Sequence, residues 1–313
     1  MIQTCIICNQ SFQSEKSFHY HLSKSHKIKK EEYYPKFYPR SDLYSNDPII
    51  FKDKEQYLNS FFNNRANLIK YIKERPKEEV QKTLINILKY RKESKHLKFA
   101  PSYIELKSAN LLPTQPCFDL VGLDYNQVCL DLGLLLKYDY KQFVQIQAVS
   151  NQDLTALIDT REQLPLSLPI KTIKTALDFG DICIKSNKLD FNNLFFERKS
   201  INDLISTISQ GYERLQDEIT RAAEMNCYIV IICEKPLNHV MNFDFSQWVK
   251  KFTKASPSFI FSRIRELMQK NENCQFLFCN SREHMSELII KLYKLTNSVK
   301  TIDLQLFLEK GMI

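Results

Sequence analysis

The carboxy-terminal half of this sequence predicts a domain of the α/β class, preceded by two smaller segments. After about residue 153, short apolar runs alternate with helical patterns. The first 27 residues hold a pair of cysteines and a pair of histidines, and the residues between these regions are basic and helical in pattern. The expected organisation is a Cys/His unit at 1–27, a basic helical region at 28–150, the α/β domain at 151–300 and a tail at 301–313.

Length and composition describe an ordinary globular protein. The chain has 313 residues, 43% hydrophobic and 26% charged, which suits two or three folding units. It contains neither a signal-like start nor a run of about eighteen apolar residues, so we expect no membrane span and an intracellular protein, nuclear in a eukaryote and otherwise cytoplasmic. The nine cysteines are odd in number and scattered, which favours reduced thiols.

Basic residues are concentrated between Lys27 and Ala100. This stretch holds 18 Lys and Arg against 10 Asp and Glu, and the excess equals the net charge of the whole chain, +8. A basic segment attracts polyanions, because its side chains neutralise phosphates and release their counterions. DNA is therefore the first partner to consider, and a solvated helical surface is the alternative.

The first 27 residues have the spacing of a zinc site. Cys5-x2-Cys8 and His21-x4-His26, separated by twelve residues, suit two thiolates on a turn and two imidazoles on one helix face that close a tetrahedron around Zn²⁺. Apolar residues at 12 and 18 complete the pattern, which resembles the classical ββα zinc finger. So short a segment cannot bury enough surface to fold alone, so metal binding and folding should be coupled.

The helix of this finger carries no residue typical of guanine recognition. Counting back from His21, the positions that such fingers use to read bases fall at Ser14, Ser17 and Tyr20. We therefore expect phosphate or partner contacts and no sequence specificity, with His19 facing solvent. The lysines expected to contact phosphates are Lys16, Lys24, Lys27, Lys29 and Lys30.

The middle region predicts helices. Apolar residues recur three and four apart over 55–74 and 78–93, with Pro76 between the two helices. Residues 102–136 alternate short helical patterns with turns. This arrangement suits either a small helix-turn-helix DNA-binding module or a plain helical spacer.

The α/β region predicts five strands and four helices, and a mostly parallel sheet flanked by helices is the natural architecture. The expected strands are 154–159, 180–186, 193–199, 227–234 and 274–280, and the expected helices are 202–209, 212–225, 259–270 and 281–295. Cys183, Cys227 and Cys233 fall on apolar strand patterns and are expected in the core.

Two carboxylates and a lysine provide the minimum for phosphodiester hydrolysis. Asp181 opens one predicted strand and Glu197 closes the next, so adjacent strands can bring both side chains to one end of the sheet. Paired carboxylates hold Mg²⁺ or Mn²⁺, which neutralises charge and activates water. Lys199 lies two residues after Glu197, on the same strand face, where an ammonium can orient the water and stabilise developing negative charge.

Further residues match a known family. Gly180-Asp181 followed by Glu197-Arg198-Lys199 and Asp203 resembles the GD...ERKxxxD signature of the XPF-type structure-specific endonucleases. Asp159-Thr160-Arg161-Glu162 looks like the DxRE element of that family. The segments YERLQDEITRA and CYIVIICE also occur in the order of the family, so the resemblance covers about residues 153–300.

This resemblance implies a restriction-endonuclease-like fold and a metal-dependent DNA endonuclease. Asp181 and Glu197 would be the Mg²⁺ or Mn²⁺ ligands and Lys199 the catalytic lysine, with Arg198 and Asp203 in support. The remaining members of the acidic pocket would be Asp159, Arg161 and Glu162. Relatives commonly cleave branched, flapped or forked DNA in repair, recombination or replication, and form homodimers or heterodimers through the nuclease domain.

Two features leave an alternative open. The helix-hairpin-helix motifs of many relatives are not visible, so duplex binding would pass to the finger, to the basic region or to a partner. The chain could instead be a zinc-finger nucleic-acid-binding regulator or a non-catalytic nuclease partner that keeps an inert fold. On the helix after the signature, Glu213, Arg214, Glu218 and Arg221 are expected to form ion pairs.

Overall fold

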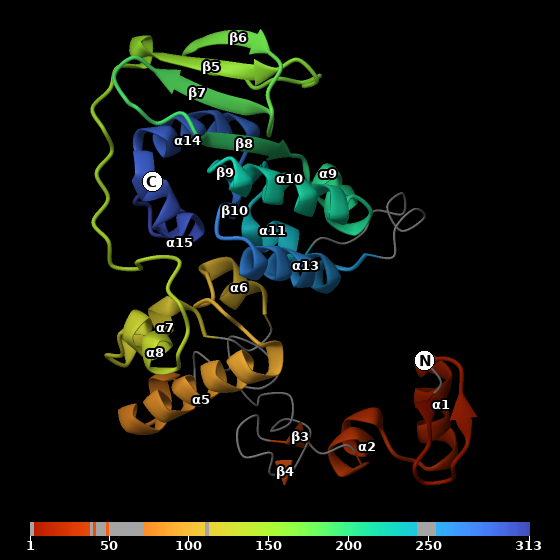
Figure 1. Ribbon diagram of the computed structural model, residues 1–313. Coiled ribbons are helices and arrows are strands. Elements are labelled where there is room, and N and C mark those ends of the chain that lie inside the picture. The colour runs from red at the N-terminus through yellow and green to blue at the C-terminus, as the bar shows by residue number, and fades with distance from the viewer. Residues whose placement is uncertain (1–2, 38–39, 42–47, 50–71, 110–112, 243–254) are drawn as a thin grey trace. The chain divides into compact units, whose positions relative to one another are not determined.

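The computed structural model describes residues 3–37, 40–41, 48–49, 72–109, 113–242 and 255–313 (Figure 1). The chain divides into two compact units. The first unit comprises Met1–His96 with Asn110–Leu123, and the second comprises Leu97–Ala109 with Asp124–Ile313. Nearly all of the helix expected at 55–74 lies outside the described residues.

The amino-terminal finger has the predicted ββα order. Strands β1 (Gln3–Thr4) and β2 (Ser11–Phe12) pair antiparallel, and helix α1 (Glu15–Ser25) follows. The start of the region expected at 28–150 forms a second helix, α2 (Lys30–Phe37). Its Tyr33 is fully buried with Phe18, and the Tyr33 hydroxyl accepts a hydrogen bond from the Ile6 N–H at 2.8 Å. The packed finger therefore extends past residue 27, because these contacts tie α2 to the ββα core.

The rest of the first unit includes two described helices and a short strand pair. Helix α5 (Lys77–Lys95) follows Pro76, as predicted, and buries one stripe that includes Val80, Leu84 and Leu88. Helix α7 (Gln115–Leu120) lies near it, since the Gln81 side chain donates to the Val121 carbonyl at 2.8 Å. The strand pair is β3 (Arg40–Ser41) with β4 (Pro48–Ile49).

The second unit is built on a six-stranded sheet of order β10-β9-β8-β7-β5-β6. Strand β7 runs opposite to both of its neighbours, and all other pairings are parallel, so the prediction of a mostly parallel sheet is confirmed. The strands are β5 (Leu154–Asp159), β6 (Lys171–Thr175), β7 (Ile182–Ser186), β8 (Leu194–Lys199), β9 (Tyr228–Cys233) and β10 (Cys274–Phe278).

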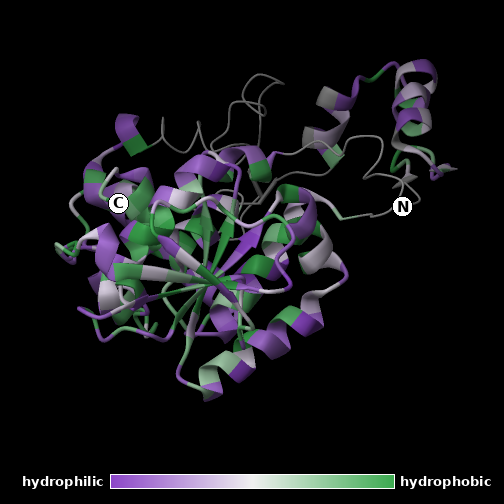
Figure 2. Ribbon diagram, turned by 90° about the horizontal axis from the view of Figure 1, so that it is seen from above, coloured by the Kyte–Doolittle hydropathy of each residue, from purple (hydrophilic) through white to green (hydrophobic). Residues whose placement is uncertain are grey.

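Helices cover both faces of this sheet, and Figure 2 shows that its central strands are largely apolar. One face packs on α14 and α15, through core residues such as Val230, Leu288 and Phe307. The other face meets α10 and α13, where the rings of Phe261 and Phe278 lie 5.7 Å apart. The helices after β8 are α9 (Ile201–Ser209), α10 (Tyr212–Glu224), α11 (Leu237–Met241), α13 (Pro257–Lys270), α14 (Arg282–Lys294) and α15 (Leu304–Glu309).

The edge strand β6 was missed in the sequence. Its residues KTIKT are exposed except for the partly covered last one, and they include two lysines. Because this edge strand is solvated, its sequence shows no alternation of apolar and polar residues. Lysines on an edge strand commonly protect it against pairing with another sheet edge.

Two of the three cysteines expected in the core are buried, namely Cys183 and Cys233. Cys227 precedes β9 and is only half-buried.

The segment expected as a tail belongs to the core of the second unit. Ile302, Leu304 and Phe307 are buried, and α15 packs beside β10. The buried Asp303 carboxylate caps α15 by accepting from the Leu306 N–H at 3.1 Å, and it also accepts from the Tyr103 N–H at 2.5 Å. Helix α6 (Tyr103–Ser108) is thus part of the second unit. The same unit contains α8 (Tyr125–Asp131) and two short 3-10 helices, Asn151–Asp153 and Thr296–Lys300.

Candidate functional site

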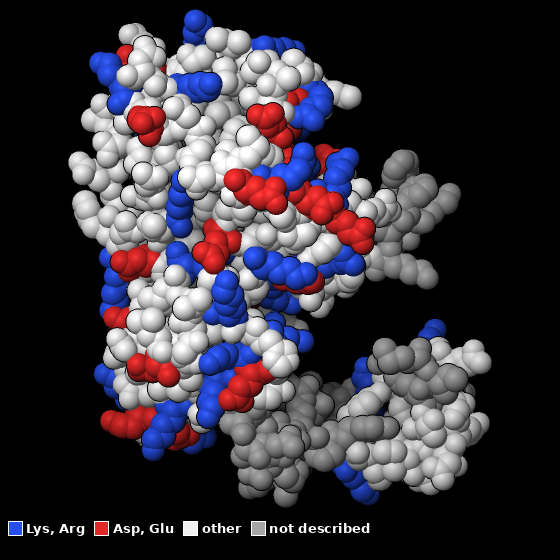
Figure 3. Space-filling view, in the orientation of Figure 1, with Lys and Arg blue, Asp and Glu red and all other residues white. Residues whose placement is uncertain are grey.

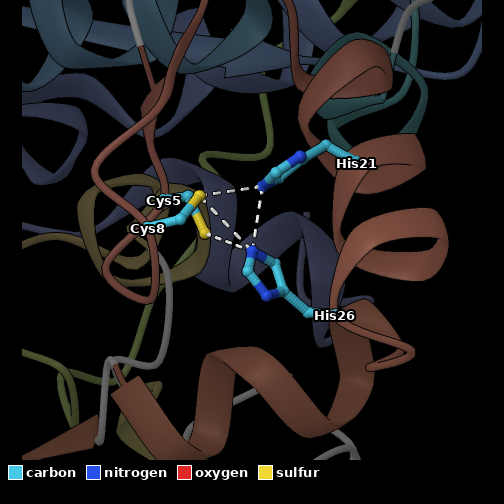
Figure 4. Close-up of side chains that lie close together, drawn as sticks. All are labelled: Cys5, Cys8, His21 and His26. Carbon is cyan, nitrogen blue, oxygen red and sulfur yellow. Dashed lines mark hydrogen bonds between the residues drawn. The ribbon is translucent and has the colours of Figure 1, made fainter.

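The four predicted ligands of the finger converge on one point (Figure 4). The His21 Nε2 lies 3.2 Å from the Cys8 Sγ and 3.1 Å from the His26 Nε2, and the Cys5 Sγ lies 3.5 Å from the same His26 atom. All four ligand atoms lie within 4.8 Å of one another. Zinc bonds of about 2.0–2.3 Å give tetrahedral edges of about 3.3–3.8 Å, so the shorter of these distances are near those of a zinc tetrahedron.

The local electrostatics favour the ligand forms of two of these side chains. Burial raises the pKa of Cys5, but hydrogen bonds from Cys8, Ile7 and Tyr33 together outweigh it, and the pKa is lowered overall. Burial and the neighbouring His26 lower the pKa of His21. Metal ligation requires a thiolate and a neutral imidazole, and both shifts are in that direction.

One other residue of the finger, His19, is placed differently from what the sequence predicts. His19 is half-buried, and its Nε2 lies 3.0 Å from the Tyr34 hydroxyl of α2, so the expectation that it faces solvent is wrong. The Ser14 and Ser17 hydroxyls lie 2.8 Å apart, and the Ser14 side chain caps α1. Tyr20, the third expected base-reading position, is 65% exposed.

In the second unit, the turn before β7 brings Asp181 to the end of β8. Continuing the register of the β7–β8 ladder places Asp181 across from Glu197. The Asp181 N–H donates to the Phe196 carbonyl at 2.8 Å, and the Asp181 Oδ2 accepts from the Arg198 N–H at 2.8 Å. The two carboxylates are thus held at one end of the sheet, as the sequence predicted.

Gly180 permits this close approach. Its φ is +60°, and a Cβ at this position would lie 2.8 Å from the Phe196 carbonyl oxygen, so a larger residue would be both strained and obstructed. The Gly180 N–H donates to the Glu218 Oε1 at 3.1 Å. This bond connects α10 directly to the turn that carries Asp181.

Glu197 and Lys199 form an ion pair on one face of β8. The Lys199 Nζ lies 2.6 Å from the Glu197 Oε1, and the two side chains are only 13% and 15% exposed. Burial raises the pKa of Glu197 to about 7; Lys199 opposes this shift and the charge of Asp181 adds to it. Burial also raises the pKa of Asp181. Two neighbouring carboxylates with raised pKa values are stabilised in their charged form by a bound cation.

Asp159 and Arg161 are engaged mainly with each other. The Asp159 side chain is 2% exposed and receives the Arg161 Nε at 2.7 Å and the Nη2 at 2.9 Å, as well as the Leu177 N–H at 2.8 Å. The Arg161 hydrogen bonds hold the pKa of Asp159 far below its usual range. These bonds order the loop at the end of β5.

Glu162 and Arg198 belong to a chain of alternating charges. The Arg198 Nη2 lies 3.3 Å from the Glu162 Oε1, and the Arg198 Nη1 lies 3.6 Å from the Glu234 Oε2. Arg282 of α14 adds a further contact to Glu234 at 3.5 Å and donates to the carbonyl of Leu164. Glu234 and Arg282 were missed in the sequence, because they follow β9 and β10 and carry no local motif.

Asp203 has a structural partner. Its carboxylate accepts from the Ser200 hydroxyl at 2.6 Å, and the Ser200 Oγ accepts from the Asp203 N–H at 3.1 Å. This reciprocal arrangement caps α9 and explains the serine between the two signature residues. Asp203 still lines the same pocket as the other acidic residues.

One pocket of about 550 Å³ brings most of the predicted residues together. Asp159, Arg161, Glu162, Asp181, Glu197, Arg198 and Asp203 line it, and Lys199 is joined to it through Glu197. Three residues of α10 also line it: Arg214, Glu218 and Arg221. The structure therefore corrects the expectation that these three form ion pairs along α10, since they face the pocket and Glu218 binds the Gly180 N–H.

The carboxylates of this pocket suit a cation that is only partly coordinated by protein. In the described part of the chain, the finger is the only group of three or more Cys, His or acidic residues close enough to hold an ion. Asp181 and Glu197 supply two carboxylates, and Mg²⁺ is usually bound by one or two carboxylates with water and substrate phosphates. Their chemistry fits Mg²⁺ or Mn²⁺ on these terms.

The fold and the pocket together define a class. A central sheet flanked by helices, with acidic residues gathered at the strand ends, is a restriction-endonuclease-like arrangement, as the sequence predicted. More particularly, residues 158–292 match the family model of the ERCC4 domain. That match runs from the end of β5 into α14, and it supports an XPF-type nuclease domain in this part of the chain.

Two solved structures are similar to part of the chain. XPF from Aeropyrum pernix is 18% identical over 44% of this chain and 61% of its own, with a TM-score of 0.32. XPF from Aeropyrum pernix in complex with DNA is 18% identical over 45% and 62%, with a TM-score of 0.31. The chain thus spans about three fifths of the length of these structures.

No curated protein matches this chain. None of the described helices is long and apolar enough to cross a bilayer.

Proposed function

We propose that this protein is a metal-dependent DNA endonuclease whose active centre is the pocket at the ends of β7 and β8. One observation carries the proposal: Asp181 and Glu197 are held across from each other, and Lys199 contacts Glu197 at 2.6 Å. The match of residues 158–292 to the ERCC4 domain supports the same conclusion. By resemblance, branched, flapped or forked DNA is the proposed substrate, and a homodimer or heterodimer is the proposed assembly.

The protein residues divide the work by position. Asp181 and Glu197 would hold Mg²⁺ or Mn²⁺, which supplies charge neutralisation and an activated water. The Lys199 ammonium, fixed by Glu197, is placed to orient that water and to stabilise charge that develops on the phosphate. Arg198 holds Asp181 through its backbone N–H and Glu162 through its side chain. The Asp159–Arg161 pair keeps the neighbouring loop in place.

The finger is proposed to bind a structural zinc ion and to add affinity for DNA. Four convergent ligands support the zinc site. The exposed Tyr20 and the nearby Lys16 and Lys24 line one hollow on α1, and the Lys24 Nζ lies 5.8 Å from the Tyr20 ring centre. With Ser14 and Ser17 bonded to each other, this surface favours contact with the phosphate backbone over the reading of bases.

Cleavage by the full-length protein tests the activity. Labelled flap, fork and linear duplex DNA are incubated with Mg²⁺ or Mn²⁺ and with the wild type, Asp181→Asn or Lys199→Ala. We expect wild-type cleavage that is strongest on the branched substrates. Each substitution should lower the rate by about 10²–10⁴-fold, the usual contribution of a catalytic group of this kind.

Matched controls come from the opposite end of the β7–β8 hairpin. Lys188→Ala and Asp190→Asn change exposed residues in the loop between these strands, and their rates should stay near that of the wild type. Equal cutting by Asp181→Asn and the wild type would remove the assignment. DNA binding without cleavage in either metal would instead favour the alternative of a non-catalytic binding protein.

A further inference from the structure

One helix face beside the acidic pocket carries basic groups that the proposed chemistry does not use. Helix α10 buries Leu215, Ile219 and Ala222, which form a single stripe at helical spacing. The residue before each of these lies in the adjacent stripe: Arg214, Glu218 and Arg221, all of which line the pocket. The stripe therefore borders the sheet on the side of Asp181 and Glu197.

Two contacts fix this stripe against the turn before Asp181. The Glu218 Oε1 accepts from the Gly180 N–H at 3.1 Å, and the Arg221 guanidinium lies 6.0 Å from the ring centre of Phe179. Both contacts reach the two residues that precede Asp181. The face of α10 that carries the arginines is thus held next to the proposed catalytic centre.

The arginines of the pocket differ in what they already bind. Arg161 is paired with Asp159, and Arg198 is paired with Glu162 and Glu234. By contrast, the guanidinium groups of Arg214 and Arg221 make no ion pair or hydrogen bond with any described residue, and both side chains are exposed. Figure 3 shows acidic and basic side chains gathered together in this region of α9 and α10. Arg214 and Arg221 are therefore available to a ligand.

Their spacing suits a nucleic-acid strand. Seven residues of helix at about 1.5 Å each separate Arg214 and Arg221 by about 10 Å along the axis. Phosphates of one strand advance by about 3.4 Å per nucleotide along a duplex, so the two side chains match phosphates about three nucleotides apart. The pocket itself is lined by seven acidic residues, which repel DNA, so cationic groups at its border are needed to hold the backbone.

We infer that Arg214 and Arg221 of α10 form a phosphate-binding site that holds the backbone of the DNA strand to be cut across the acidic pocket. This inference rests on the proposed function for the identity of the strand, but its contacts are with phosphates and carry no base specificity. Glu218 is the positioning residue between them, because it ties α10 to the Gly180 turn.

Salt-dependent DNA binding tests the site without relying on cleavage. Full-length Asp181→Asn protein, with and without Arg214→Gln or Arg221→Gln, is titrated onto a fluorescein-labelled flap duplex at several KCl concentrations. Each Arg→Gln change should reduce the slope of log K against log [KCl] by about 1, as expected for one lost phosphate contact. Arg214→Lys and Arg221→Lys should restore the slope, since the charge is retained.

Lys188→Gln, at the far end of the β7–β8 hairpin, is the matched loss of charge and should leave the slope unchanged. Thermal melting of each variant separates a binding effect from unfolding, and the Lys variants provide folded comparators. Unchanged slopes in both Arg→Gln variants would overturn the inference, even if the wild type cleaves DNA. Reduced slopes in a protein that never cleaves would support the phosphate site while rejecting the nuclease proposal.

Discussion

The finger and the acidic pocket are both clusters of polar side chains, but they are assembled differently. The finger takes its four ligands from residues 5–26, and its core contains few side chains, among them Phe18, Leu22 and Tyr33. The pocket takes its residues from 159–221 and relies on partners at Glu234 and Arg282. The sheet beneath the pocket has a large apolar core of its own.

The two clusters therefore differ in the interaction that stabilises them. In the finger, the ligands would replace a missing core, so the fold should depend on the metal. In the second unit, the apolar core supports the sheet, and the carboxylates are held by backbone N–H groups and by arginines. Its structure should therefore survive without metal.

Removing the metal should unfold the finger alone. Structural zinc contributes on the order of 10 kcal/mol to such units. We expect a chelator, or Cys5→Ser, to collapse the amide NMR signals of residues 3–37 in the full-length protein while the signals of the second unit remain. Loss of the sheet signals on chelation would contradict the contrast.

Truncating the core should have the converse effect. Leu288 is fully buried between α14 and the sheet, so Leu288→Ala should destabilise the second unit by about 2–5 kcal/mol. Urea unfolding followed by the fluorescence of the chain checks this value. The affinity of the finger for zinc should be unchanged, and a large decrease in it would show that the two regions are not independent.

Acidification should stabilise the second unit over a limited range. Burial raises the pKa of Asp303 to about 6 from its ordinary 3.8, and the charge of Glu105 adds to this. Because the folded state holds this proton more tightly, the Asp303 contribution is favourable below pH 4 and is lost as the pH rises through about 6. The full difference is about 3 kcal/mol. Stability measured between pH 7.5 and 5 should rise more steeply in the wild type than in Asp303→Asn, and equal slopes would contradict the assignment.

Removing one hydrogen bond between α2 and the rest of the finger should have the smallest effect. Tyr33→Phe keeps the ring in the core but removes the acceptor of the Ile6 N–H. The loss of this hydrogen bond should cost about 1 kcal/mol, which is about a fivefold weaker affinity for zinc. Competition with a chromogenic chelator measures this change. Tyr20→Phe, at an exposed position of α1, should leave the affinity unchanged.

Local patterns in the sequence predicted much of the molecule. The five buried strands and the four main helices of the α/β region were found, because burial on two faces leaves apolar runs and burial on one leaves helical spacing. The convergent Cys/His set of the finger was found for a related reason: four ligands around one ion require a fixed short spacing in the chain. Strand β6 and helix α15 were not found, since an exposed edge and a six-residue helix carry too weak a pattern.

Sequence motifs alone identify the candidates for chemistry, namely the Cys/His set and the constellation of Asp181, Glu197 and Lys199. The contacts that hold these side chains in place follow from the folded arrangement. The ion pair of Arg198 with Glu234 and the hydrogen bonds from Gly180 to Glu218 and from Tyr103 to Asp303 join residues far apart in the chain. Such contacts leave no periodic trace, because they depend on which strands and helices become neighbours after the core has formed.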